Sequence, residues 1–168
     1  YSLDLSNINN VRLIQNQTIA KPILLGIVSE MPFVEGMTPL IYNTAALLGM
    51  DNQILSVYHK RHLVPFGEYI PMKEWLRFAK RFTVAVGDFS PGNSNHPLEY
   101  EGLKMGMLIC YEDIFPRLAR QSILAGANVL VNLTNDAWYG NTSALYQHAV
   151  FSQMRALEMR IPKFIRFP

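Results

Sequence analysis

An α/β fold, built of sheet layers covered by helices, is predicted by the way strand-like and helix-like segments alternate along the 168 residues. Short apolar runs are bounded by glycine, proline and asparagine, which is typical of buried strands. Longer stretches with helical start and stop signals lie between the later runs. Because neither an internal repeat nor a low-complexity segment interrupts this pattern, residues 1–168 are expected to belong to a single domain.

These signals place the individual elements in order along the chain. Strands are expected over residues 22–28, 40–48, 53–59, 103–109, 128–133 and 163–167. Helices are expected over residues 9–20, 117–125 and 141–160, with Pro162 ending the last of them. The second and third strands are separated by Gly49-Met-Asp-Asn52, which is typical of a hairpin connection.

Composition excludes several classes of protein. Hydrophobic residues make up 49% of the chain and charged residues 17%, which indicates a globular domain. The net charge is only +2, so nucleic acid is not an expected partner. No window approaches the roughly 18 apolar residues of a membrane span. His59 and His62 have ligand-like spacing, but neither a cysteine nor a carboxylate pattern completes a site, so no metal is expected.

Cys110 is the only cysteine, and it stands where a nucleophile would be built. It ends the strand expected over 103–109. Beyond it, Asp113 can cap and Pro116 can open a helix. A thiol facing the start of a helix lies in the positive end of the helix dipole, which favours the reactive thiolate. A buried cysteine that acts as a small hydrophobic residue is the alternative.

Lys60 is the second candidate, because it directly follows the strand expected over 53–59. A lysine beside a thiolate can stabilise the oxyanion that forms after attack, whereas solvated surface charge is the ordinary alternative. Glu68 can orient this lysine or be a plain loop acid. Glu112 would point to the same side as the thiol if strand geometry continued, and it is equally a helix N-terminal acid.

Residues 73–82 predict a helix with two contrasting faces. One face carries Trp75, Phe78, Ala79 and Phe82, and the other carries Lys73, Arg77, Lys80 and Arg81. Aromatic residues opposite a basic face suit a membrane interface with anionic lipids. A helix packed on the domain, with its basic side solvated, is the alternative.

Four motifs follow one another in an order that is typical of one enzyme family. They are Tyr-His-Lys-Arg-His-Leu-Val-Pro-Phe-Gly-Glu-Tyr-Ile-Pro over 58–71, Leu-Ile-Cys-Tyr-Glu over 108–112, Asn-Leu-Thr-Asn-Asp-Ala-Trp-Tyr-Gly over 132–140, and the helical segment 147–158. Together they resemble the carbon–nitrogen hydrolase (nitrilase) superfamily, and within it the bacterial apolipoprotein N-acyltransferases. The resemblance covers about residues 23–162.

The resemblance implies a four-layered α-β-β-α sandwich and a Glu–Lys–Cys catalytic triad. Cys110 would be the nucleophile and Lys60 the triad lysine. Supporting roles are implied for Glu68, Tyr111 and Glu112. Substrate-binding roles are expected for Trp75, Phe78 and Trp138.

The implied reaction moves a fatty acyl chain from a phospholipid, through a thioester on Cys110, to the N-terminal amine of a diacylglyceryl lipoprotein. It needs no metal or organic cofactor. The implied location is the bacterial inner membrane, with this domain on the periplasmic side. A soluble nitrilase-type amidase and a non-catalytic domain of the same fold are the alternatives.

The triad glutamate is not found among the motifs. Family order places it in a Pro-Glu motif ahead of the strand expected over 22–28, but residues 1–20 contain Asp4 and no glutamate. Glu30 and Glu35 come too late. The family's membrane helices and the Asn-Gly segment after Arg160 are not matched either. The sequence is therefore expected to be a partial domain, incomplete at both ends and inactive alone.

Overall fold

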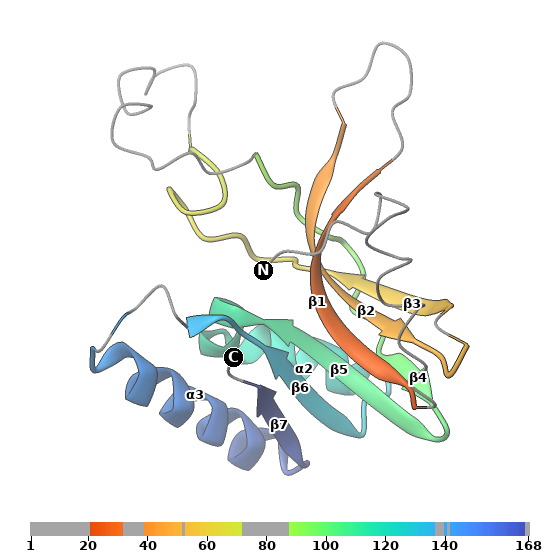
Figure 1. Ribbon diagram of the computed structural model, residues 1–168. Coiled ribbons are helices and arrows are strands. Elements are labelled where there is room, and N and C mark those ends of the chain that lie inside the picture. Colours follow the sequence, from red (N-terminus) through yellow and green to blue (C-terminus); the bar gives the residue numbers. More distant parts are fainter. Residues whose placement is uncertain are drawn as a thin grey trace.

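The computed structural model describes residues 21–31, 39–51, 53–71, 88–136, 140 and 142–166 (Figure 1). The first of its two sheets is antiparallel and three-stranded, in the order β1-β2-β3. Its strands are β1 (Ile23–Glu30), β2 (Ile41–Leu48) and β3 (Ile54–His59). The predicted hairpin between β2 and β3 is confirmed, and the Gly49 N–H donates to the Gln53 carbonyl across it.

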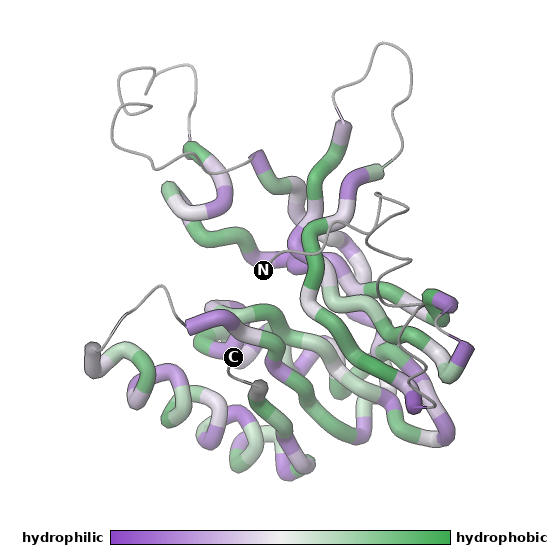
Figure 2. The backbone as a smooth tube through the Cα atoms, viewed as in Figure 1, coloured by the Kyte–Doolittle hydropathy of each residue, from purple (hydrophilic) through white to green (hydrophobic). Residues whose placement is uncertain are grey.

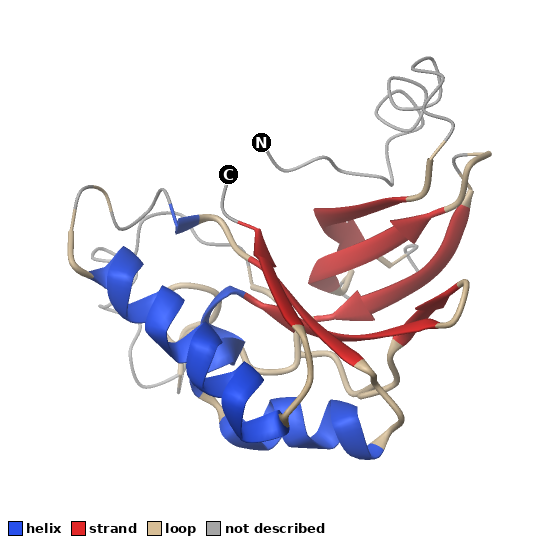
Figure 3. Ribbon diagram, turned by 90° about the horizontal axis from the view of Figure 1, so that it is seen from below, coloured by secondary structure: helices blue, strands red, loops and turns tan. Residues whose placement is uncertain are grey.

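The second sheet is four-stranded, in the order β4-β5-β6-β7. Its strands are β4 (Leu98–Tyr100), β5 (Leu103–Ile109), β6 (Val129–Leu133) and β7 (Lys163–Arg166). β4 pairs with β5 antiparallel, whereas β5, β6 and β7 run parallel. The parallel strands are connected by helices α2 (Pro116–Leu124) and α3 (Ala144–Met159). Both helices cover the face of this sheet that points away from the first sheet (Figure 3).

The layers form because β5 and β6 carry apolar residues on both faces, so that each face has to be covered. Figure 2 shows the hydrophobic run along β6 and another along β1 of the first sheet. Met107 and Ile109 pack between the two sheets against Ala45 and Tyr58. Leu108, which alternates with them, packs on the opposite face in a second core with Leu118, Ala119 and Leu130. The predicted α/β sandwich is confirmed, and the described residues form a helix layer and two sheet layers.

Several expectations need correction. The short strand β4 was not predicted, because three residues are too few for a clear alternating pattern. A 3₁₀ helix, η2 (Cys110–Ile114), directly follows β5. Pro116 does open α2, but Asp113 does not cap it; the N-cap is Phe115, without a side-chain cap bond. The helices expected over 9–20 and 73–82 lie outside the described residues.

Gly92 fixes the end of β3. Its N–H donates to the Lys60 carbonyl at 2.8 Å, and a Cβ added here would lie 2.3 Å from the His59 carbonyl oxygen. We expect Gly92→Ala to reduce the free energy of unfolding by about 1–3 kcal/mol, because backbone has to move. Gly26→Ala is the control, since its Cβ would meet only an ordinary contact at 3.9 Å. Thermal unfolding of both variants tests this, and equal stabilities would contradict it.

Candidate active site

Lys60 is buried at the end of β3, with 1% of its surface exposed. Its Nζ donates to Glu68 Oε1 at 2.8 Å. Its backbone N–H donates to the Asn43 carbonyl on β2. The alternative of solvated surface charge is therefore wrong, and Lys60 is a buried cation with a carboxylate partner.

Glu68 is held on both of its carboxylate oxygens. Oε1 accepts from Lys60 and from Asn43 Nδ2 at 3.1 Å, while Oε2 accepts the Val64 N–H at 2.8 Å. The backbone between Val64 and Glu68 turns tightly, since the Glu68 N–H donates to the Val64 carbonyl and Phe66 adopts a left-handed φ of 61°. The segment 60–68, called the lysine loop below, is thus closed by hydrogen bonds that direct Glu68 back onto Lys60.

Cys110 lies at a strained turn between β5 and η2. Its φ is 52°, in the left-handed region, which costs a non-glycine residue about 1–2 kcal/mol. Strict alternation along β5 would place its side chain with Leu108, on the helix side. The positive φ instead brings Cys110 against the core between the two sheets, where it is only partly buried. The turn therefore places the thiol on the side of the second sheet that faces the first sheet, where part of its surface stays accessible.

Glu112 connects the cysteine turn with the lysine loop. The carboxylate is fully buried, and Oε1 accepts the N–H groups of Arg61 and His62 at 2.7 and 2.9 Å. Oε2 accepts the Ile109 N–H at 2.8 Å and the Tyr58 hydroxyl at 2.9 Å. Burial raises the pKa of Glu112 above its usual value, and these hydrogen bonds oppose that rise.

This arrangement joins the backbone segments that flank the two catalytic candidates. Lys60 directly precedes Arg61, and Cys110 directly follows Ile109, so each candidate adjoins a backbone N–H bound by the same carboxylate. The strand geometry on which the expected orientation of Glu112 depended does not continue past Cys110. Instead, Glu112 lies in the first turn of η2 and binds backbone more than 45 residues away in sequence.

We expect Glu112→Gln to destabilise the complete protein by about 1–3 kcal/mol. All four partners are donors, so the amide nitrogen of glutamine would face at least one backbone N–H without an acceptor. Glu99→Gln, at an exposed position, is the matched control and should change stability by less than about 0.5 kcal/mol. Chemical unfolding measures both; similar losses for the two variants would show that Glu112 does not tie these segments together.

The remaining predicted site residues are only partly described. Tyr111 has 39% of its surface exposed, and its ring lies edge-on to that of Phe115. Trp75, Phe78 and Trp138 lie outside the described residues. No group of three or more His, Cys, Asp or Glu side chains in the described part of the chain could hold a metal ion. His59 lies instead 2.8 Å from Thr44 Oγ1, and burial lowers its pKa.

Sequence reasoning missed several residues that hold this site. Arg61 joins the lysine loop to α2 through Gln121 Oε1 and the Leu118 carbonyl. Asn132 and His148 both contact the Cys110 carbonyl oxygen. All three lie inside the quoted motifs, but nothing in their local pattern indicates partners so distant in sequence.

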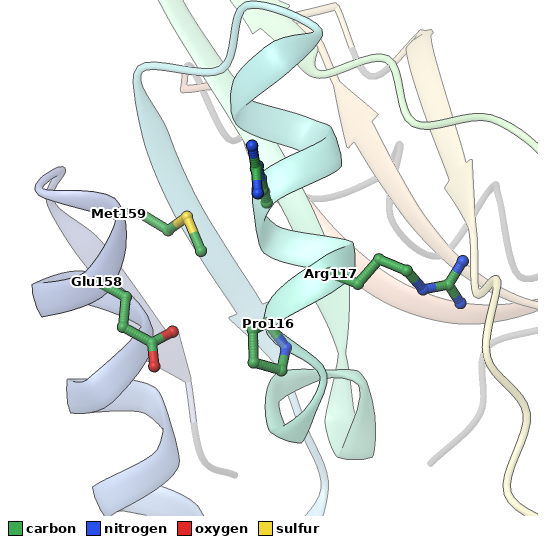
Figure 4. Close-up of a pocket in the computed structure, with 5 residues that line it drawn as sticks. Pro116, Arg117, Glu158 and Met159 are labelled. Carbon is green, nitrogen blue, oxygen red and sulfur yellow. The ribbon is translucent and has the colours of Figure 1, made fainter.

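A surface pocket of about 620 Å³ lies apart from these residues, between the start of α2 and the end of α3 (Figure 4). It is lined by Pro116, Arg117, Arg120, Glu158 and Met159. None of the predicted site residues within the described ranges lines it. No helix within the described ranges has both the length and the hydropathy needed to cross a bilayer.

Comparison with known proteins decides the family. The family model described as carbon-nitrogen hydrolase matches residues 16–164. The chain belongs to the carbon–nitrogen hydrolase family. Solved structures agree on the fold: a carbon-nitrogen hydrolase from Helicobacter pylori superposes with a TM-score of 0.58 at 20% identity, covering 94% of this chain and 48% of its own. Nit3 of Saccharomyces cerevisiae, a member of the nitrilase superfamily, gives 0.57 at 22%, covering 94% and 50%.

Curated relatives of this carbon–nitrogen hydrolase chain carry a more specific name. Apolipoprotein N-acyltransferase of Geobacter metallireducens is 45% identical over 120 residues, which are 71% of this chain and 23% of that protein. The protein of the same name from Brucella suis is 40% identical over 144 residues, or 83% of this chain and 27% of that protein. The chain thus spans about a quarter of the length of these relatives.

Proposed function

We propose that this carbon–nitrogen hydrolase chain forms the catalytic core of a bacterial N-acyltransferase. Its substrate pair would be a phospholipid acyl donor and a diacylglyceryl lipoprotein acceptor. One observation carries the proposal: a buried, carboxylate-paired lysine and a partly exposed cysteine adjoin backbone groups bound by the same carboxylate, that of Glu112. The relatives named apolipoprotein N-acyltransferase support the choice of substrates.

The first half-reaction forms a thioester. A base removes the thiol proton, and Cys110 Sγ attacks the carbonyl carbon of the phospholipid ester, so that the electron pair of the C=O bond moves to oxygen. The Lys60 ammonium and a backbone N–H stabilise this oxyanion. As it collapses, the C–O bond breaks and the lysophospholipid leaves as an alcohol, with the proton returned by the base.

The second half-reaction uses the thioester as the acyl donor. The N-terminal amine of the lipoprotein attacks the thioester carbonyl while the base takes one of its protons, and Lys60 again stabilises the oxyanion. The C–S bond then breaks, and the base returns the proton to the Cys110 thiolate. Both oxygens of Glu68 and both of Glu112 already accept hydrogen bonds. Neither side chain is therefore proposed as the base. We assign that role to a further glutamate of the complete protein.

Membrane attachment forms part of the proposal, because both the donor and the acceptor carry acyl chains. We place the domain on the periplasmic side of the bacterial inner membrane. The aromatic and basic faces expected over residues 73–82 suit contact with lipid, and Trp75, Phe78 and Trp138 remain proposed substrate-binding residues.

Intact-mass measurement on the complete protein tests this function. The protein is incubated with a phospholipid of defined acyl chain, and a covalent adduct of that acyl mass is expected. A synthetic diacylglyceryl lipopeptide with a free N-terminal amine should then discharge the adduct and become N-acylated, whereas an N-acetylated lipopeptide should not. Rapid loss of the adduct to free fatty acid without acceptor would indicate a hydrolase instead, and failure to form any adduct would contradict the proposal.

A further inference from the structure

A buried polar cluster lies under η2, on the side of the second sheet that carries the helices. Its members are Asp113, Asn132, Asp136, His148, Ser152 and Lys163. Burial lowers the pKa of Lys163, which donates to Asp113. Buried charges add little net stability compared with apolar packing, and the proposed chemistry uses none of these side chains. We therefore infer the role of the cluster from the groups that it contacts.

Two members of the cluster contact the backbone of the proposed nucleophile. His148 Nε2 lies 3.1 Å from the Cys110 carbonyl oxygen, and Asn132 Nδ2 lies 3.3 Å from it. The two amide hydrogens of Asn132 are accounted for by that carbonyl and by Asp113 Oδ2 at 2.9 Å. Asn132 Nδ2 also lies 3.2 Å from His148 Nε2, but because both amide hydrogens have oxygen acceptors, we assign Nε2 as a donor to the carbonyl.

Asp136 orients His148 from the other side of the ring. Nδ1 lies 2.9 and 3.1 Å from the two carboxylate oxygens of Asp136, which can only accept. Asp136 lies in the segment after β6, and Thr134 Oγ1 donates to it in turn. The ring is thus fixed between the Asp136 carboxylate and the Cys110 carbonyl.

Holding the carbonyl on the helix side sets the direction of the next N–H. The C=O and N–H groups of a trans peptide point in opposite directions, and no cis peptide bond occurs among the described residues. The Tyr111 N–H is consequently directed away from the cluster, toward the side on which Cys110 packs. It lies in the first turn of η2, where backbone N–H groups have no partner within the helix.

We propose that His148, oriented by Asp136, is a positioning residue that holds the Cys110–Tyr111 peptide plane so that the Tyr111 N–H faces the oxyanion. This inference rests on the proposed role of Cys110 as a nucleophile. The left-handed φ of Cys110 is a conformation that the backbone leaves unless its surroundings hold it. The contacts of His148 and Asn132 with the carbonyl supply that constraint.

The test compares three variants of the complete protein. His148→Leu removes the contacts of the ring with Asp136 and with the Cys110 carbonyl, and His148→Gln keeps a terminal N–H that can reach the Cys110 carbonyl. Ser152→Ala is the control: Ser152 is buried on the same helix one turn later, and its hydroxyl donates to Asp113 rather than to the Cys110 carbonyl. Each is measured for kcat and KM of acylation by p-nitrophenyl butyrate, for the rate of alkylation by iodoacetamide, and for Tm.

His148→Leu should lower kcat about 10²-fold with KM little changed, because a misdirected oxyanion donor affects the transition state alone. Alkylation should stay near the wild-type rate, since it forms no oxyanion. His148→Gln should recover most of kcat, and Ser152→Ala should lower Tm without changing kcat. Unchanged kcat in His148→Leu, or an equal fall in acylation and alkylation, would overturn the inference.

The choice of ester separates this inference from the proposed function. A wild-type protein that reacts with p-nitrophenyl butyrate but not with phospholipid would contradict the acyl donor proposed above. The comparison of His148 variants would still decide whether the peptide plane is held in this way.

Discussion

Cys110→Ala in the complete protein should abolish the acyl adduct and lower acyl transfer about 10⁴-fold or more, as expected when a nucleophile that forms a covalent intermediate is removed. The alanine side chain keeps the Cβ and is small enough to occupy the turn without new contacts. The loss would therefore reflect chemistry and not folding, and an unchanged Tm would establish this. Intact-mass spectra after incubation with phospholipid provide the measurement.

Cys110→Ser is the informative companion variant. A serine hydroxyl is far harder to deprotonate than a thiol, so it needs a stronger base for the same attack. We expect activity nearly as low as in Cys110→Ala, although the serine preserves a nucleophilic atom at almost the same position. An acyl adduct that persists in Cys110→Ala would mean that another residue carries the acyl group.

Sequence pattern predicted the strands of this domain well, for a physical reason. β5 and β6 are buried on both faces, so they appear as unbroken apolar runs, and the β2–β3 hairpin has a turn sequence of its own. Lys60 directly follows β3 and Cys110 directly follows β5, so the sequence could place both residues at strand ends. β4 could not be found, because three residues leave too little pattern.

The polar interior of the site could not be predicted in the same way. Asp113 and Glu112 follow a strand and precede a helix, and acids in that position ordinarily cap or complement the helix N-terminus. Here Asp113 binds Asn132, and Glu112 binds backbone in the lysine loop. Asn132 becomes a neighbour of Asp113 only when β5 and β6 pair, and the lysine loop becomes a neighbour of Glu112 only when the two sheets pack together. The left-handed turn at Cys110 has no sequence signal because the residue is not glycine.

Lys60→Met should remove the proposed oxyanion stabilisation and lower acyl transfer about 10²–10³-fold. Methionine has nearly the same shape and carries no charge, so it would also leave Glu68 without its cation. Removing one partner of a buried ion pair costs about 3–5 kcal/mol of stability, although Asn43 and the Val64 N–H would still bind the carboxylate. A loss of activity in this variant alone could therefore reflect a displaced loop.

The double variant Lys60→Met with Glu68→Gln separates the two causes. It replaces the ion pair by neutral side chains of similar size, so Tm should recover most of what Lys60→Met loses, while acyl transfer should stay as low as in the single variant. Lys60→Arg should fail as well, because the planar guanidinium cannot take the place of a compact ammonium that contacts Glu68 Oε1 at 2.8 Å. If the double variant regained activity together with stability, Lys60 would serve only to neutralise Glu68, and the oxyanion would have to be stabilised by backbone N–H groups without it.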